Sequence, residues 1–106
     1  MFDIIWLDED NDGCEYWNEI FSTDLDFIDK LYSNCGNFEY DRVTRYKSDS
    51  KDYDTVKLYN SSLKALTKYI LNKEWEPMGQ TNISSSNDDD PAIRYIFKKK
   101  KTCYEL

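Results

Sequence analysis

The sequence predicts an α+β domain: a mainly antiparallel sheet of about four strands with two helices packed on it. Short β-prone runs alternate with two segments of helical periodicity, and the last two predicted strands are joined by a short connection that favours an antiparallel hairpin. The chain has 106 residues, 40% of them hydrophobic and 16% aromatic. Disordered chains lack that much apolar and aromatic surface. We therefore expect a single folded domain over residues 1–106.

The first half of the chain contains one clear strand signal and one clear helix signal. FDIIWL is short and rich in β-formers, and the later helix has Ser22 or Thr23 as its N-cap and Gly36 at its C-terminal end. CEYWNEIF fits either the return strand of a hairpin or the first turns of a helix. The expected elements are, in order, a strand at 2–7, the ambiguous segment at 14–21, a helix within 22–36, a strand at 38–47 and a polar loop at 48–54.

The second half repeats the pattern and ends in a hairpin. NSSLKALTKYILNK has an apolar stripe at helical spacing and begins with Asn60 or Ser61 as its N-cap. Pro77 places the strand that contains it near a sheet edge or marks a strand start, and AIRYIFKKK alternates most clearly of all. The expected elements are a strand extension or lead-in at 55–59, a helix at 60–73, a strand at 75–83, a turn at 84–91 and a strand at 92–100.

This helix–strand–turn–strand order carries a resemblance. EWEPMGQ followed by RYIFKKK resembles a widespread group of small uncharacterised bacterial domains, in which a helix precedes a GWE-type strand and a terminal YIFKR-type strand. Glu74 stands where that group prefers glycine. The resemblance covers about residues 38–101 and implies a strand–helix–strand–strand unit without an assigned activity. The matching residues are Trp75, Glu76, Tyr95, Ile96, Phe97 and Lys98.

Charge is distributed unevenly along the chain. The net charge is −7, but residues 1–37 hold ten acids and one base, a net −9, whereas residues 38–106 hold eleven acids and thirteen bases, a net +2. An acidic N-terminal third argues against nucleic-acid binding and favours a basic partner or a cation. The lysine run at 98–101 is typical of a solubilising strand edge.

One acidic stretch matches a metal-binding pattern. DEDNDGCEYWNE, residues 8–19, fits the calcium loop of an EF-hand, with Asp8, Asp10, Asp12 and Glu19 as ligands and Gly13 at the sharp turn. Glu15 occupies a loop position where an EF-hand has an apolar residue, and no second loop of this form follows. The same stretch therefore also fits an exposed acidic turn, for which Asp12-Gly13 is a favoured hairpin pair.

Other chemistry is excluded or disfavoured by composition. The chain has no histidine, so a Ser-His-Asp or Cys-His site is impossible, and its three isolated glycines form no phosphate loop. Three cysteines without zinc spacing indicate free thiols in a cytoplasmic protein. No apolar run reaches the length of a membrane span. We expect neither an enzyme nor a membrane protein.

The favoured function is a small acidic interaction module that binds a basic protein surface. Such a module could be an inhibitor or immunity-type protein that masks a nucleic-acid-binding site. Alternatives are a calcium-binding protein that uses the 8–19 loop and a structural subunit. Acidic charge steers a basic partner, and aromatic residues anchor interfaces. The predicted contact residues are Asp8, Glu9, Asp10, Asp12, Glu15 and Glu19, with Tyr16 and Trp17 as anchors.

Overall fold

The computed structural model describes residues 3–11, 13–47, 52–72, 74–83 and 92–100. Within these ranges the chain forms two α-helices, one short 3₁₀ turn and six strands. The elements are, in chain order, β1 (Ile4–Asn11), β2 (Tyr16–Ser22), α1 (Leu25–Ser33), the 3₁₀ turn η1 (Cys35–Asn37), β3 (Arg42–Lys47), β4 (Asp54–Tyr59), α2 (Leu63–Leu71), β5 (Trp75–Ile83) and β6 (Ala92–Lys99).

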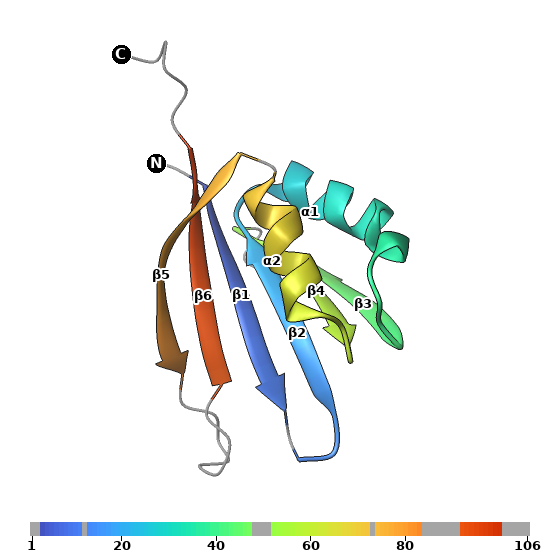
Figure 1. The fold of residues 1–106 in the computed structure, drawn as a ribbon. Coiled ribbons are helices and arrows are strands. Elements are labelled where there is room, and N and C mark those ends of the chain that lie inside the picture. The colour runs from blue at the N-terminus through green and yellow to red at the C-terminus, as the bar shows by residue number, and fades with distance from the viewer. Residues whose placement is uncertain (1–2, 12, 48–51, 73, 84–91, 101–106) are drawn as a thin grey trace, which may run out of the picture.

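The six strands form one antiparallel sheet in the order β3-β4-β2-β1-β6-β5 (Figure 1). Three sequential pairs, β1–β2, β3–β4 and β5–β6, are joined by two long-range pairings, β2 with β4 and β1 with β6. The N-terminal strand therefore lies near the middle of the sheet, beside the C-terminal strand. Residues 38–101 do not form a continuous part of the sheet, because β2 and β1 separate β3–β4 from β5–β6.

Both helices cover the same face of the sheet (Figure 1). Apolar residues at alternate positions of β1 and β4 face the helices, whereas β2, β5 and β6 each contribute one residue to the buried core and β3 contributes none. Burial of such aliphatic side chains contributes about 1.5–3 kcal/mol each. The core consists of Ile5, Leu7, Ile20, Phe27, Ile28, Leu31, Cys35, Val56, Leu58, Leu66, Ile70, Trp75 and Phe97.

The opposite side of the sheet, which we call the open face, carries no helix within the described residues (Figure 1). Its side chains come from the alternate positions of the same strands and are mostly polar or aromatic. The residues of the open face that matter below are Trp6, Asp8, Asp10, Trp17, Glu19, Phe21, Arg42, Tyr46, Lys57, Tyr59 and Arg94.

The α+β class, the antiparallel sheet and the two helices are confirmed, but the expected number of four strands is wrong. The ambiguous segment at 14–21 belongs to β2, and the lead-in expected at 55–59 is β4, a buried central strand. The pattern of β2 is obscured because its core-facing positions include polar Asn18 and Ser22. Asn18 is fully buried, yet its amide donates to the hydroxyl and carbonyl oxygens of Ser61 at 2.8 and 3.2 Å.

The helix boundaries also differ from the expected ones. Asp24, not Ser22 or Thr23, caps α1 by accepting from the backbone N–H of Phe27. Ser22 is still part of β2: its hydroxyl donates to the Ile4 carbonyl and accepts from the backbone N–H of Asp24, so it lies before the helix rather than at its N-cap.

At the start of α2 and at the end of α1, the observed capping residue also lies one or two positions from the predicted one. Ser62, not Asn60 or Ser61, caps α2. Gly36 lies in η1, whereas α1 ends at Ser33 with Asn34 as its C-cap. Pro77 does lie on an edge strand, at an irregularity in the β5–β6 register. The turn predicted at 84–91 lies outside the described residues, as do positions 48–51 of the predicted polar loop.

Glu74, between α2 and β5, adopts a φ of 70°. A side chain in this left-handed region costs about 1–2 kcal/mol, and glycine is free of that cost.

We predict that Glu74→Gly raises the free energy of unfolding by about 0.5–1 kcal/mol, because relief of the left-handed strain exceeds the entropy cost of glycine. Urea unfolding followed by circular dichroism measures this change. Glu39→Gly, at an exposed position whose φ is not positive, is the matched control and should lower stability by a similar amount. Destabilisation by both substitutions would contradict the strain at Glu74.

Candidate functional site

The acidic stretch 8–19 forms most of the β1–β2 hairpin. In the register of the hairpin Asp8 lies opposite Glu19, and Asp10 lies opposite Trp17. Residues 8–11 and 16–19 are therefore paired strands rather than a continuous loop that wraps around an ion, as an EF-hand does. Asp12, the third of the four predicted ligands, lies outside the described residues. Among the residues that the structure describes, no three carboxylates or thiols cluster in a way that could hold a metal ion.

Asp8 is held by a cation from the other end of the chain. The guanidinium of Arg94 donates from Nε and Nη2 to the two carboxylate oxygens of Asp8 at 2.7 and 2.8 Å. Asp8 is only 6% exposed, and this bidentate bond raises the pKa of Arg94. The pair satisfies a carboxylate that would otherwise be buried without a partner.

Glu19 is bound on the same face by two neighbours. The indole N–H of Trp17 donates to Glu19 at 3.1 Å, and the ammonium of Lys57 on β4 lies 3.8 Å from the same oxygen. Lys57 also lies 4.2 Å from the centre of the Trp17 ring. Burial raises the pKa of Glu19, and the charge of Lys57 offsets only part of that effect.

Toward the sheet edge a second basic side chain pairs with an acid and also lies over an aromatic ring. Arg42 on β3 contacts Glu15 at 3.4 Å, and its guanidinium lies 3.7 Å from the centre of the Tyr59 ring. Hydrogen bonds involving Lys57 and Arg42 lower the pKa of the Tyr59 hydroxyl. Cations and rings therefore alternate across β3, β4 and β2, a cation–π arrangement.

Tyr16 and Trp17, the two predicted anchors, lie on opposite faces of the hairpin. The Tyr16 hydroxyl, whose pKa is raised by burial, donates to Glu9 at 3.1 Å on the helix side of the sheet. Trp17 lies on the open face. A flat partner surface on one side of the sheet can contact only one of them.

The uneven charge distribution of the sequence is partly neutralised by ion pairs within the molecule. Five acids of residues 1–37 form ion pairs with bases of residues 38–106. The paired bases come from β3, β4 and β6, so the uneven charge distribution links the N-terminal hairpin and α1 to the rest of the sheet. The pairs are Asp8–Arg94, Glu15–Arg42, Glu19–Lys57, Asp24–Lys99 and Asp29–Arg45.

Aromatic rings gather on the open face around these pairs. Tyr53 makes edge contacts with Trp6 and Phe21, at ring-centre distances of 6.3 and 6.0 Å. All three rings are partly exposed. A shallow hollow of about 390 Å³ lies beside them and is lined by Glu19, Phe21, Tyr46, Lys47, Tyr53, Thr55 and Lys57.

Sequence reasoning missed Trp6, Phe21, Lys57 and Arg94 as members of this surface. Trp17, Glu19 and Phe21 stand at alternate positions, so these three residues would have been predicted to share one face if the segment had been identified as a strand. Pairing of β1 with β6, which brings Arg94 to Asp8, joins residues 86 positions apart. No local pattern reports such a contact.

No known protein family has a model that matches this chain, and no curated protein matches it. No helix in the described residues combines the length and the apolar character needed to span a membrane. The resemblance of residues 38–101 to the small bacterial domains stays a prediction.

We predict that Glu19→Gln changes how stability depends on pH. Because the folded-state pKa of Glu19 is raised, its contribution is fully present below the unfolded-state pKa, near 4.5, and is lost as pH rises through the folded-state pKa. Glutamine keeps the Trp17 acceptor and does not titrate. The variant should therefore gain stability relative to the wild type as pH rises above about 4.5.

Urea unfolding of both proteins between pH 4 and pH 7 measures this difference. Lys57→Met provides a control in the opposite direction: it removes the charge that lowers the pKa of Glu19, so stability should fall more steeply with pH than in the wild type. A Glu19→Gln difference that is constant, or that falls with pH, would contradict the raised pKa.

Proposed function

We propose that the protein is a binding module that contacts a basic protein surface through its open face, at the end nearest the β1–β2 turn. The observation that carries the proposal is the group of partly exposed rings on the open face, which none of the described helices covers (Figure 1). Trp17 and Tyr59 lie side by side there, with ring centres 6.0 Å apart. Tyrosine and tryptophan are enriched at the energetic centres of interfaces.

Charge supports a basic partner. The net charge is −7, which raises the rate of association with a cationic surface. Asp10 lies directly opposite Trp17 in the hairpin, and its described bond is to the backbone N–H of Asn11. The exposed Glu15–Arg42 pair is of the kind that contributes little stability, so a partner cation can replace Arg42.

Nucleic acid is a less suitable partner for the open face, although aromatic rings alternate with lysine and arginine side chains there. Lys57 and Arg94 are paired with Glu19 and Asp8, so their charges are not available to neutralise phosphates. The same pairs occupy two of the predicted calcium ligands. A partner that itself binds nucleic acid has the basic surface this module needs, and covering that surface would make the module an inhibitor.

Four variants test the proposal. Trp17→Ala and Asp10→Lys change the proposed contact surface. Tyr32→Ala and Glu39→Lys make the same kinds of change elsewhere, at an exposed ring on α1 and at an exposed acid before β3. Each tagged protein is used to capture partners from an extract of its own cells, and the affinity of each captured basic protein is then measured with purified components.

We expect a basic protein that the wild type and both controls bind equally. Trp17→Ala should weaken that binding at least tenfold, as truncation of a central aromatic residue commonly does, and Asp10→Lys should slow association. Equal binding by all four variants, or a partner that is nucleic acid, would refute the proposal. Circular dichroism establishes that each variant is folded.

A further inference from the structure

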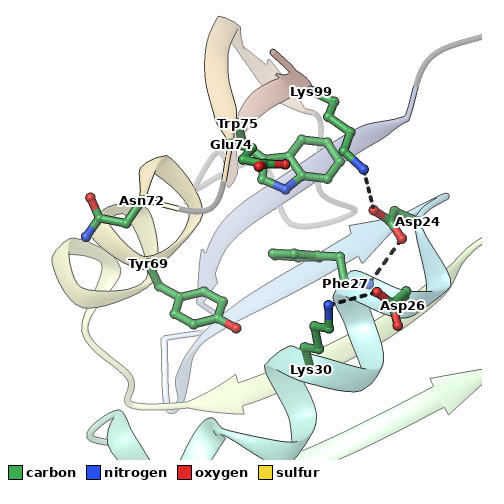
Figure 2. A pocket seen from close by; sticks show the side chains of 9 residues that line it. All are labelled: Asp24, Asp26, Phe27, Lys30, Tyr69, Asn72, Glu74, Trp75 and Lys99. Atoms are coloured by element: carbon green, nitrogen blue, oxygen red, sulfur yellow. Dashed lines mark hydrogen bonds and ion pairs between the residues drawn. The ribbon is translucent and has the colours of Figure 1, made fainter. Parts of the chain in front are cut away.

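A second candidate site lies on the helix side of the sheet, away from the open face. A cavity of about 350 Å³ opens between the start of α1, the end of α2 and the adjoining ends of β5 and β6 (Figure 2). That volume is at the small end of the range for ligand pockets and suits one ring system with a small substituent. Its lining residues are Asp24, Asp26, Phe27, Lys30, Tyr69, Asn72, Glu74, Trp75 and Lys99.

Three aromatic side chains form the apolar wall of this cavity. The ring centre of Phe27 lies 5.5 Å from that of Trp75 and 6.2 Å from that of Tyr69. Phe27 and Trp75 are almost completely buried, whereas Tyr69 on α2 is partly exposed. The Tyr69 ring therefore presents a surface on which a flat ligand can stack.

The indole N–H of Trp75 is the most informative group. Trp75 is 2% exposed, yet its N–H forms no hydrogen bond within the part of the chain that the structure describes. Figure 2 shows the nitrogen on the side of the ring that faces Tyr69 and Phe27. Within the described residues the one fully buried side-chain nitrogen or oxygen without a partner is Nε of Arg45, so the indole N–H of Trp75 opens onto the cavity, where a ligand can supply an acceptor.

Two of the three carboxylates that line the cavity form ion pairs with lysines, and the third does not within the described residues. Asp26 pairs with Lys30 at 3.0 Å, and Asp24 pairs with Lys99 at 3.7 Å (Figure 2). Glu74 has no such partner among the described residues, and it lies at the strained φ of 70°. At a position whose backbone favours glycine, the chain therefore places the carboxylate of Glu74 at the cavity wall.

We propose that this cavity binds a guanine base, free or as a nucleoside. Guanine carries two neighbouring N–H donors for a carboxylate and, next to them, a carbonyl acceptor for an N–H. Glu74 and the indole N–H of Trp75 are the complementary pair, and the partly exposed Tyr69 ring stacks on the base. A simple organic cation has no acceptor for the indole. This inference is independent of the proposed partner of the open face.

Nuclear magnetic resonance of the whole chain, labelled with nitrogen-15, tests the inference with guanosine as the probe. The chain has three tryptophans, so three indole N–H signals are expected, and Trp75→Phe identifies the one from Trp75. Guanosine should shift that signal in a saturable way and leave the Trp17 signal in place. Adenosine, which lacks the carbonyl and the adjacent ring N–H, should leave all three unshifted.

Glu74→Gly tests the carboxylate without damaging the fold, because glycine suits this backbone. We expect the dissociation constant for guanosine to rise at least tenfold, as loss of a hydrogen bond to a charged group commonly causes. Glu39→Gln removes an exposed charge elsewhere and should leave the constant unchanged. The inference is overturned if guanosine leaves the Trp75 signal unshifted at millimolar concentration. It is also overturned if adenosine or arginine amide shifts that signal equally, or if Glu74→Gly binds as well as the wild type.

Discussion

The contact between Asp8 and Arg94 joins the two ends of the chain in the middle of the sheet. β1 pairs with β6 along six residues, and the ion pair closes over that pairing on the open face. On the helix side the same pairing is held by core packing that includes Ile5 and Phe97, and on the open face the ion pair adds the side-chain contact between β3-β4-β2-β1 and β6-β5. The guanidinium of Arg94 also lies 6.0 and 5.7 Å from the ring centres of Trp6 and Phe21, so the same contact organises the aromatic surface.

This constraint changes the meaning of the acidic N-terminal third. Five of its ten acids pair with bases that are far away in sequence and close in space, so half of these acids are engaged within the fold. The residues that we propose for recognition are fewer: Trp17, Tyr59 and Asp10 on the open face, and Glu74 with Trp75 in the cavity on the helix side. The two surfaces lie on opposite sides of one sheet and need not act together.

The sequence predicted the elements whose signals are local. α1, α2 and β6 have clear apolar periodicity, and Pro77 correctly indicated an edge strand. β2 was ambiguous because Asn18 and Ser22 occupy core-facing positions, and their burial is possible only through hydrogen bonds to Ser61 and Ile4. β4 was too short, and too close to a predicted helix, to be recognised as a central strand.

The candidate sites divide in the same way. The pattern of the 8–19 stretch drew attention to the correct hairpin, but it could not show that Tyr16 and Trp17 face opposite sides. Nor could it show that Lys57 and Arg94 occupy its acids, because those contacts depend on strand order. Glu74 was visible from sequence only as a departure from glycine, and its meaning came from a positive φ and from its place beside Trp75 at the wall of the helix-side cavity.

A double-mutant cycle on Asp8 and Arg94 tests the central role of their contact most directly. Asp8→Asn and Arg94→Met keep the size of the side chains, and urea unfolding gives the stability of the wild type, both single variants and the double variant. We predict a coupling energy above about 1 kcal/mol, against less than about 0.5 kcal/mol for the exposed Asp26–Lys30 pair. Effects that simply add for Asp8 and Arg94 would contradict the account.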